Sequence, residues 1–223
     1  SRALIEERAL ACGAVLVLEG AADGGAIKIG RKGCGTFHVE IKGRASHAGL
    51  EPEAGVNALI EASHQVIDIT TIGRPDIGTT VTPTVATAGT TDNVVPAEAK
   101  VIVDVRVESA DEKDRVEAAF AALAPHLNEA TISVTGGVNR PPMPQSLSAE
   151  LFAMARDVMP GIEGTSVGGG SDGNFTAAIG VPTLDGLGAV GGGAHADHEY
   201  LVVDAMAERA RLVAGLVTTL SRR

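Results

Sequence analysis

Side chains able to bind a metal gather in one short segment near the C-terminal end of the chain. The stretch GGGAHADHEY, residues 191–200, places His195, Asp197, His198 and Glu199 close together. Imidazole and carboxylate groups are the usual ligands of a catalytic zinc ion, and the glycines let the backbone approach closely. The segment alone has too few spaced ligands for a complete zinc site, and a polar surface loop is the alternative interpretation.

Two other segments carry candidate binding groups. Glu19 closes the apolar run AVLVLEG, residues 14–20, and ligands of open α/β sheets bind at the carboxyl ends of strands. Glu19 is therefore a candidate ligand, unless it only caps a turn. The stretch GGGSDGN, residues 168–174, precedes a short predicted helix, and free N–H groups at such an end bind anions. This loop either holds a substrate carboxylate or is a flexible connector. Asp172 is also expected to cap the helix that follows. The candidate substrate-binding residues of the loop are Gly168, Gly169, Gly170, Ser171 and Asp172.

Three polar residues of the central region are further candidates. His47 lies in RASHAG after a predicted strand, Asn93 lies in TTDNVVP, and Arg106 lies in the strand KVIVDVRV. Each also has an ordinary interpretation. His47 is then a surface histidine and Asn93 a turn residue. Arg106 shares a strand face with Asp104 and is expected to oppose Glu40 across the sheet as an ion pair.

The elements that must position these residues follow two patterns. A helix over residues 1–12 and a buried strand over 14–20 form half of an α/β repeat. From residue 33 the pattern becomes β-α-β-β-α-β, which is a ferredoxin-like module. Its expected elements are an alternating strand through 37–42, a helix at 55–72, strands at 79–88 and 100–107, a helix at 109–123 and a strand at 130–134.

Four details of this module can be checked in a structure. The strand at 100–107 alternates through Val101, Val103, Val105 and Val107, and Ser109 to Glu112 has the S-x-x-E form of a capping box at the start of the following helix. Pro83 lies within the second strand, and a proline there requires an edge position or a bulge. The helix at 55–72 has a predicted apolar stripe formed by Val56, Leu59, Ile60 and Ile67.

After residue 140 the pattern returns to α/β. A helix at 148–159, a strand at 181–185 and a helix at 203–221 are expected. The simplest architecture is one α/β domain, residues 1–32 and 141–223, into which the βαββαβ module, residues 33–140, is inserted.

Composition excludes several classes of protein. The formal net charge is −10 and aromatic residues make up 2% of the chain, so neither a basic surface nor a stacking platform for nucleic acid is expected. No apolar run approaches the length of about 18 residues of a membrane span. The two cysteines, Cys12 and Cys34, have no C-x-x-C spacing and predict no disulfide framework. Both are expected to be reduced thiols in the interior. A cytoplasmic protein without nucleic-acid or membrane partners is expected.

Five motifs, in order, cover essentially the whole chain: VLVLEG, GRASHAGLEPEAGVNALIEAS, DNVVPAEAKVIVDVR, GGGSDGN and PTLDGLGAVGGGAHADHEY. They resemble the zinc-dependent metallopeptidase family of glutamate carboxypeptidases, acetylornithine deacetylases and succinyl-diaminopimelate desuccinylases, and most resemble its glutamate carboxypeptidase-like members. The resemblance implies an α/β catalytic domain with two zinc ions and an inserted βαββαβ lid domain through which the protein forms a homodimer.

The resemblance also implies roles for individual residues. Glu19 matches a carboxylate ligand of one zinc ion, and His195 matches a histidine ligand of the other. His47 matches the lid histidine that reaches the partner subunit and stabilises the oxyanion. Asn93 and Arg106 match lid residues that hold the substrate carboxylate or the reacting centre. The loop from Gly168 to Asp172, with Gly169, Gly170 and Ser171 between them, matches the wall of the substrate pocket.

One departure from the family pattern limits the expected activity. The family's other metal ligands and its general base, the first residue of a Glu-Glu pair, lie upstream of a helix like SRALIEE, and Glu6 and Glu7 do not match that pair. The chain is therefore expected to be a partial catalytic domain that is inactive alone. The complete enzyme is expected to hydrolyse an amide bond in a small peptide or acyl-amino acid with a free carboxylate, for example releasing a C-terminal glutamate. The alternatives are an N-acyl-amino-acid deacylase and a non-catalytic dimerisation or binding module.

Overall fold

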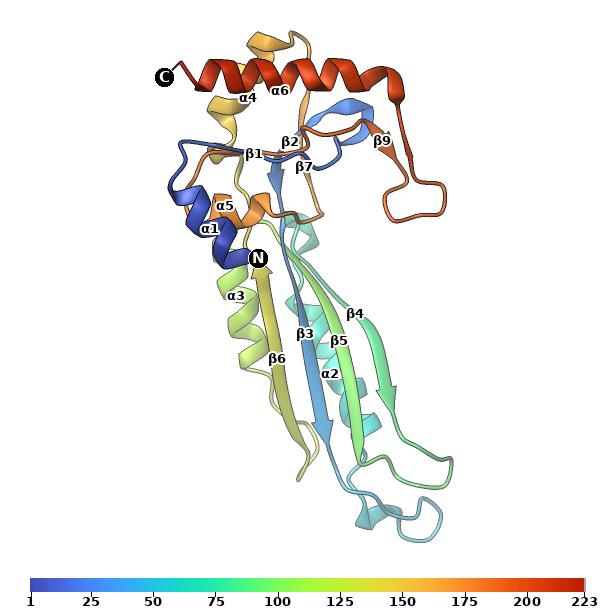
Figure 1. Cartoon of the computed structure of the whole chain (residues 1–223). Helices are drawn as coiled ribbons and strands as arrows, with labels where there is room; N and C mark the ends of the chain where they lie inside the picture. Colours follow the sequence, from blue (N-terminus) through green and yellow to red (C-terminus); the bar gives the residue numbers. More distant parts are fainter. Residues whose placement is uncertain (223) are drawn as a thin grey trace. The chain divides into compact units, whose positions relative to one another are not determined.

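The structure is a computed structural model that describes residues 1–222, coloured along the sequence in Figure 1. Its backbone contacts divide the chain into two compact units. One, here called the discontinuous unit, consists of Ser1–Gly33 and the segment from Arg140 onward; the other, the continuous unit, is Cys34–Asn139. No helix among the described residues is long and apolar enough to cross a membrane.

The continuous unit contains a four-stranded sheet and two helices, in the β-α-β-β-α-β order expected of a ferredoxin-like module. The strands lie side by side in the order β4-β5-β3-β6. The elements are β3 (Gly33–Lys42), α2 (Ala58–Ile72), β4 (Thr80–Ala88), β5 (Glu98–Val107), α3 (Ala110–Ala121) and β6 (Thr131–Arg140). β4 is an edge strand that pairs antiparallel with β5, and its register shifts between Pro83 and Val85. Pro83 therefore lies on an edge strand and at a bulge, as its missing N–H requires.

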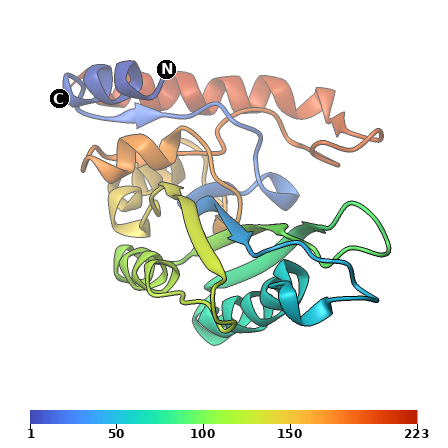
Figure 2. The ribbon, with the colours of Figure 1, turned by 90° about the horizontal axis from the view of Figure 1, so that it is seen from below.

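Both helices of the continuous unit lie on one side of its sheet, as Figure 2 shows. The apolar core comes from the central strands, in which apolar and polar residues mostly alternate. Every second residue of a strand points to the same face, so the alternating apolar residues face the helices. Phe37, Val39 and Ile41 of β3 are buried, and so is the odd-numbered series on β5 from Ala99 to Val107. Phe37 stacks on Phe120 of α3 with ring centroids 3.8 Å apart. Ser109 accepts a hydrogen bond from the N–H of Glu112 at 3.2 Å, which confirms the predicted cap of α3.

The predicted apolar stripe of α2 is wrong for three of its four residues; the fourth, Val56, is buried. Leu59, Ile60 and Ile67 are exposed, with exposed fractions of 50%, 48% and 63%. The helix instead buries a face that mixes apolar and polar residues, on which Glu61 and Gln65 are fully covered; its members are Ala58, Glu61, Ala62, Gln65, Ile69 and Ile72. Glu61 accepts hydrogen bonds from the backbone N–H groups of residues 126 and 127 at 3.0 and 2.7 Å, and from the Gln65 amide at 2.8 Å. These bonds satisfy the buried carboxylate, and they place Glu61 on the inner face of the helix while Leu59, Ile60 and Ile67 lie on the outer face.

The discontinuous unit is built from short strands and four longer helical segments. Its strands are β1 (Val15–Leu16), β2 (Ile27–Arg31), β7 (Gly164–Val167), β8 (Thr183–Leu184), β9 (Gly191–Gly192) and β10 (Tyr200–Leu201). Its helices are α1 (Arg2–Leu10), α4 (Ala149–Val158), α5 (Gly173–Ala178) and α6 (Met206–Leu220). β1 pairs with β8, and β2 with β7, both in parallel. The sequence patterns had not indicated β2 and β7.

Burial in the discontinuous unit is uneven. Leu151 of α4, Leu184 of β8, and Leu212 and Leu216 of α6 form its apolar core. The expectation that the run at 14–20 is a strand covered on both faces is wrong for the described residues, because β1 has only two residues, both half-buried, and Leu18 is 64% exposed. Cys12, expected in the interior, is also exposed.

Candidate functional site

His47 and Asn93 lie on two loops that meet at one end of the sheet of the continuous unit. The first loop follows β3, and the second joins β4 to β5. The N–H of Ala48 donates to the carbonyl of Asn93 at 2.9 Å, and the N–H of Val95 donates to the carbonyl of Ser46 at 2.9 Å. These bonds hold the two candidate residues side by side.

The His47 ring has a defined orientation. Its Nδ1 accepts hydrogen bonds from the backbone N–H groups of Gly49 at 3.1 Å and Leu50 at 3.2 Å. A ring nitrogen that accepts hydrogen bonds carries no proton, so the neutral ring bears its proton on Nε2. Because His47 is exposed, this arrangement presents an Nε2–H donor outside the loop.

Arg106 lies near the opposite end of the same sheet. It is eight residues along β5 from Glu98, which corresponds to about 26 Å at 3.3 Å per residue. Its guanidinium forms a bidentate pair with Asp104, Nε to Oδ2 and Nη2 to Oδ1, both at 2.9 Å. The hydrogen bonds that Arg106 donates to Asp104 raise the pKa of Arg106. The expected pair with Glu40 is wrong, because Glu40 instead pairs with Lys100 at 3.2 Å.

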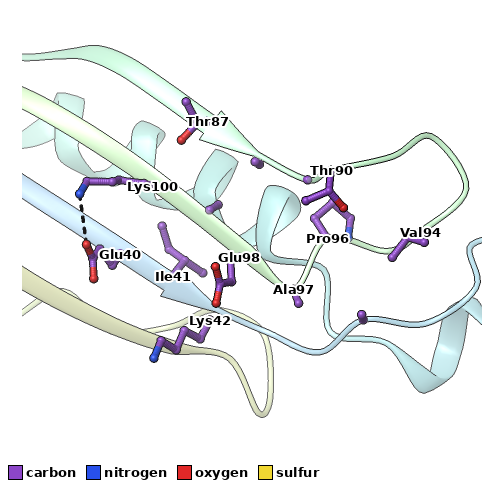
Figure 3. Close-up of a pocket in the computed structure, with 14 residues that line it drawn as sticks. Glu40, Ile41, Lys42, Thr87, Thr90, Val94, Pro96, Ala97, Glu98 and Lys100 are labelled. Carbon is purple, nitrogen blue, oxygen red and sulfur yellow. Dashed lines mark hydrogen bonds and ion pairs between the residues drawn. The ribbon is translucent and has the colours of Figure 1, made fainter.

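A cavity of about 540 Å³ opens on the polar face of this sheet (Figure 3). Its charged lining comes from β3 and β5, and its other wall is the end of β4 and the loop that carries Asn93. The charged residues are Glu40, Lys42, Glu98 and Lys100. His47, Asn93 and Arg106 are not among its lining residues, so the cavity is not where the sequence candidates meet.

Glu19 and His195 belong to the discontinuous unit, and both are exposed. Glu19 lies three residues beyond β1, and its carbonyl accepts the N–H of Gly188 at 2.8 Å. His195 lies between β9 and β10 with a backbone φ of 65°. That left-handed conformation costs a residue with a side chain about 1–2 kcal/mol, and such strain is concentrated at functional sites. The sequence did not indicate this strain.

These two residues do not form a metal centre by themselves. Among residues 1–222, no group of three or more His, Cys, Asp and Glu side chains could hold a metal ion. A zinc site needs at least three protein ligands. The described chain therefore does not fit a complete zinc site, and the expected dependence on residues outside it stays a prediction.

The Gly-rich loop after β7 is exposed at its tip and anchored at its end. Gly168, Gly169 and Gly170 are exposed, whereas Ser171 is buried. Asp172 was expected to cap the following helix, but its side chain makes no capping bond. Its Oδ1 instead lies 3.8 Å from Nη2 of Arg140, as an ion pair. The hydroxyl of Ser171 takes that place, accepting the N–H of Gly173 at 3.0 Å.

A buried ion pair that sequence reasoning missed lies directly beneath this loop. Arg31 and Asp185 form a bidentate pair at 2.7 and 3.0 Å, with exposed fractions of 6% and 0%. Arg31 is the last residue of β2 and Asp185 follows β8, so the chain brings them together only when the unit folds. Charged residues are usually exposed, so a sequence alone predicts that they lie on the surface. No pattern near Arg31 or Asp185 indicates that this pair is buried.

The fold defines a class: a discontinuous α/β unit whose sequence is interrupted by a ferredoxin-like module. Residues 29–131 match the family model described as the peptidase dimerisation domain. Carboxypeptidase G2 of Pseudomonas sp. (strain RS-16) is 32% identical over 231 residues, an alignment that covers 99% of this chain and 55% of that protein. The uncharacterized protein YqjE of Bacillus subtilis (strain 168) is 30% identical over 187 residues, an alignment that covers 79% of this chain and 49% of that protein.

Solved structures agree on the fold. Aminopeptidase PepT of Bacillus cereus superposes with a TM-score of 0.73 at 23% identity, covering 97% of this chain and 59% of that one. A tripeptidase of Staphylococcus aureus superposes with a TM-score of 0.70 at 21% identity, covering 93% and 57%. The chain belongs to the M20 peptidase family. It spans about half the length of the curated relatives named above.

Proposed function

We propose that this chain is part of a metal-dependent M20 amidohydrolase that cleaves an amide bond in a small substrate with a free carboxylate, for example to release a C-terminal glutamate. The observation that carries the proposal is the His47 ring, whose Nδ1 is held by two backbone N–H groups so that Nε2–H is the available donor. A fixed donor of this kind stabilises the oxygen that gains negative charge during attack on a carbonyl. The identity with carboxypeptidase G2 along 99% of the chain supports the substrate class.

Arg106 is proposed to bind the substrate carboxylate. Its guanidinium is charged at all relevant pH values, and its donors match two carboxylate oxygens. Asp104 already holds two of those donors, which fixes the direction of the side chain before a substrate arrives. Asn93, whose loop is hydrogen-bonded to the His47 loop, is proposed to act with His47.

His47 and Arg106 of one chain cannot hold the same small substrate, because about 26 Å of strand β5 separates their ends of the sheet. We therefore propose a homodimer in which His47 and Asn93 of one copy complete the site that contains Arg106 of the other. The proposed contact surface is the exposed side of α2, with Leu59, Ile60 and Ile67, and the adjacent edge strand β4. An exposed apolar helix face beside an open strand edge favours association with another protein surface.

The dimer is tested by sedimentation of the 223-residue chain. Ile67→Asp places a charge in the proposed contact and should convert dimers to monomers. Ile77→Asp is the matched control, because Ile77 is also exposed, at 44%, but lies outside α2 and β4. If Ile67→Asp leaves the mass unchanged, the proposed surface is wrong.

The activity is tested by comparing the chain alone with a fusion that supplies the part of carboxypeptidase G2 outside the alignment. The chain alone should release no glutamate from glutamyl dipeptides or folate-like compounds, because its described residues lack a three-ligand metal group. The fusion should release glutamate. Faster hydrolysis of N-acyl-amino acids would favour the deacylase, and a dimer with an inactive fusion would favour a binding module.

The shared site is tested by mixing two inactive fusions, His47→Ala and Arg106→Ala. In a mixed dimer, one site receives Arg106 from one subunit and His47 from the other and is intact. Random reassortment should therefore restore about a quarter of the normal activity, since half of the dimers are mixed and each has one intact site. No recovery would show that both residues act from the same subunit.

A further inference from the structure

The buried side chains beneath the Gly-rich loop are connected in an unusual way. Arg31 donates through Nε and Nη2 to Asp185, and its third donor, Nη1, reaches the carbonyl of Gly169 at 2.7 Å. The Asp185 carboxylate also accepts the Ser171 hydroxyl and the N–H of Gly186. One ion pair therefore binds two positions of the loop, the Gly169 carbonyl and the Ser171 side chain.

Asn174 anchors the same loop to two other segments. Its Oδ1 accepts the N–H of Ser171 at 2.8 Å, and its Nδ2 donates to the carbonyls of Lys32 at 3.1 Å and Pro141 at 2.7 Å. Asn174 is fully buried. Asp185 and Asn174 therefore both bind Ser171 at the end of the loop, while Gly168–Gly170 stays exposed.

The bond from Arg31 fixes the direction of one peptide plane. In a trans peptide the carbonyl of one residue and the N–H of the next point in opposite directions, and no cis peptide occurs among residues 1–222. Because the Gly169 carbonyl points inward to Arg31, the N–H of Gly170 points outward. Within the described part of the chain, this N–H has no recorded acceptor.

We propose that Arg31 and Asp185 are positioning residues that aim the N–H of Gly170 at the substrate carboxylate. Arg31 is not proposed to touch the substrate, since it is 6% exposed, Asp185 neutralises it, and each of its three nitrogens already donates a hydrogen bond. It acts through Gly169. This inference rests on the proposed function for its ligand, a carboxylate, but Arg31 and Asp185 are not among the candidate residues identified from the sequence.

Arg31→Lys is the informative variant. It keeps the positive charge for Asp185, but an ammonium group cannot hold a carboxylate with a planar fork and reach Gly169 as well. Arg209→Lys is the matched control. Arg209 is equally buried, at 6% exposure, and also binds backbone carbonyls, those of Gly25, Gly186 and Gly188, but not the Gly-rich loop.

Two NMR measurements on the 223-residue chain test the proposal. The first is hydrogen exchange at the N–H groups of Ser171 and Gly173, both of which donate within the network. Arg31→Lys should accelerate this exchange about tenfold through local opening, and Arg209→Lys should not. The second is titration with glutarate, a dicarboxylate probe, followed at the N–H of Gly170.

The glutarate titration separates positioning from simple support of the fold. Arg31→Lys should weaken glutarate binding about fivefold or more, with no comparable loss in Arg209→Lys. Faster exchange with unchanged glutarate affinity would overturn the positioning role and leave the proposed function intact. A normal chain that binds no glutarate at Gly170 would overturn the carboxylate ligand itself, and with it the substrate class proposed above.

Discussion

The two units of this chain bury polar groups in different ways. In the continuous unit the two buried carboxylates have side-chain partners close in sequence: Glu61 binds Gln65 four residues away, and Glu112 binds Arg115 three residues away. Glu61 also accepts backbone N–H groups of residues 126 and 127, but no buried ion pair among the described residues of this unit joins segments as distant as those of the other unit. In the discontinuous unit, Arg31 and Asp185 are 154 residues apart, and Arg209 binds the carbonyl of Gly25, 184 residues away.

This difference separates two sources of stability. The continuous unit is held mainly by an apolar layer between one sheet and two helices, with Val101, Val103 and Val105 at its centre. The discontinuous unit has a smaller apolar core and relies in addition on one buried ion pair and on the buried Arg209, both of which join its two segments. Breaking a buried pair by removing one partner leaves an uncompensated charge, whereas an apolar truncation leaves a cavity.

Asp185→Ala should have the largest effect. Arg31 would keep a buried charge without its partner, which costs about 3–5 kcal/mol of unfolding free energy. Hydrogen exchange should accelerate first in α5 and β8 of the discontinuous unit. Equal acceleration in β3 and β5 would show that the two units unfold together and would break the comparison. Glu129→Ala is the control, because its ion pair with Arg44 is exposed and should contribute nothing measurable.

Ile41→Ala tests the apolar layer of the continuous unit. Ile41 is 1% exposed, and its truncation should cost about 2–5 kcal/mol. The amides of β5 and α3 should lose protection, and those of the discontinuous unit should not. The same substitution at the exposed Ile77 should leave the urea midpoint unchanged; an equal loss there would mean that burial does not explain the effect.

Glu112 makes the stability of the continuous unit sensitive to acid. The hydrogen bond from Arg115, with support from Thr79 and Arg74, lowers the pKa of Glu112 from 4.5 to about 2. The folded state therefore favours the ionised form, so this stabilisation is complete above the unfolded pKa of 4.5 and is lost as the pH falls toward 2. Urea unfolding should show a difference between the normal chain and Glu112→Gln that is largest at neutral pH and shrinks on acidification. A constant difference would contradict this linkage.

The smallest effect is expected at helix caps, where the same substitution can be made in each unit. Ser109 accepts the N–H of Glu112, so Ser109→Ala should cost about 1 kcal/mol. Ser1 precedes α1 but makes no side-chain capping bond, so Ser1→Ala should change nothing. Thermal unfolding of the two variants measures the difference, and equal shifts would rule out the cap as its cause.

Prediction from the sequence succeeded for features that are set by short stretches of the chain. The alternation of β3 and β5, the Ser109 cap and the edge position of Pro83 were all confirmed. The stripe of α2 was predicted wrongly, because apolar residues were assumed to face the core. Glu61 can be buried only because backbone N–H groups from the segment after α3 reach it, and no pattern within α2 reveals them.

The candidate site shows the same limit. The loop positions of His47 and Asn93 followed from local patterns, but the bonds between their loops connect segments more than 40 residues apart. The roles of Glu19, His195 and Arg106 remain proposals based on family resemblance. Arg31 was not selected at all, because its partner Asp185 is distant in sequence.

The sequence by itself determined the β-α-β-β-α-β order of the continuous unit and membership of the M20 family, because strand alternation, turn residues and motif order are local properties. Only the tertiary structure decided which side of α2 is exposed, that Arg106 lies far along the sheet from His47, and that Arg31 holds the Gly-rich loop through Gly169. Each of these depends on contacts between residues distant in the chain, which form only when the units fold.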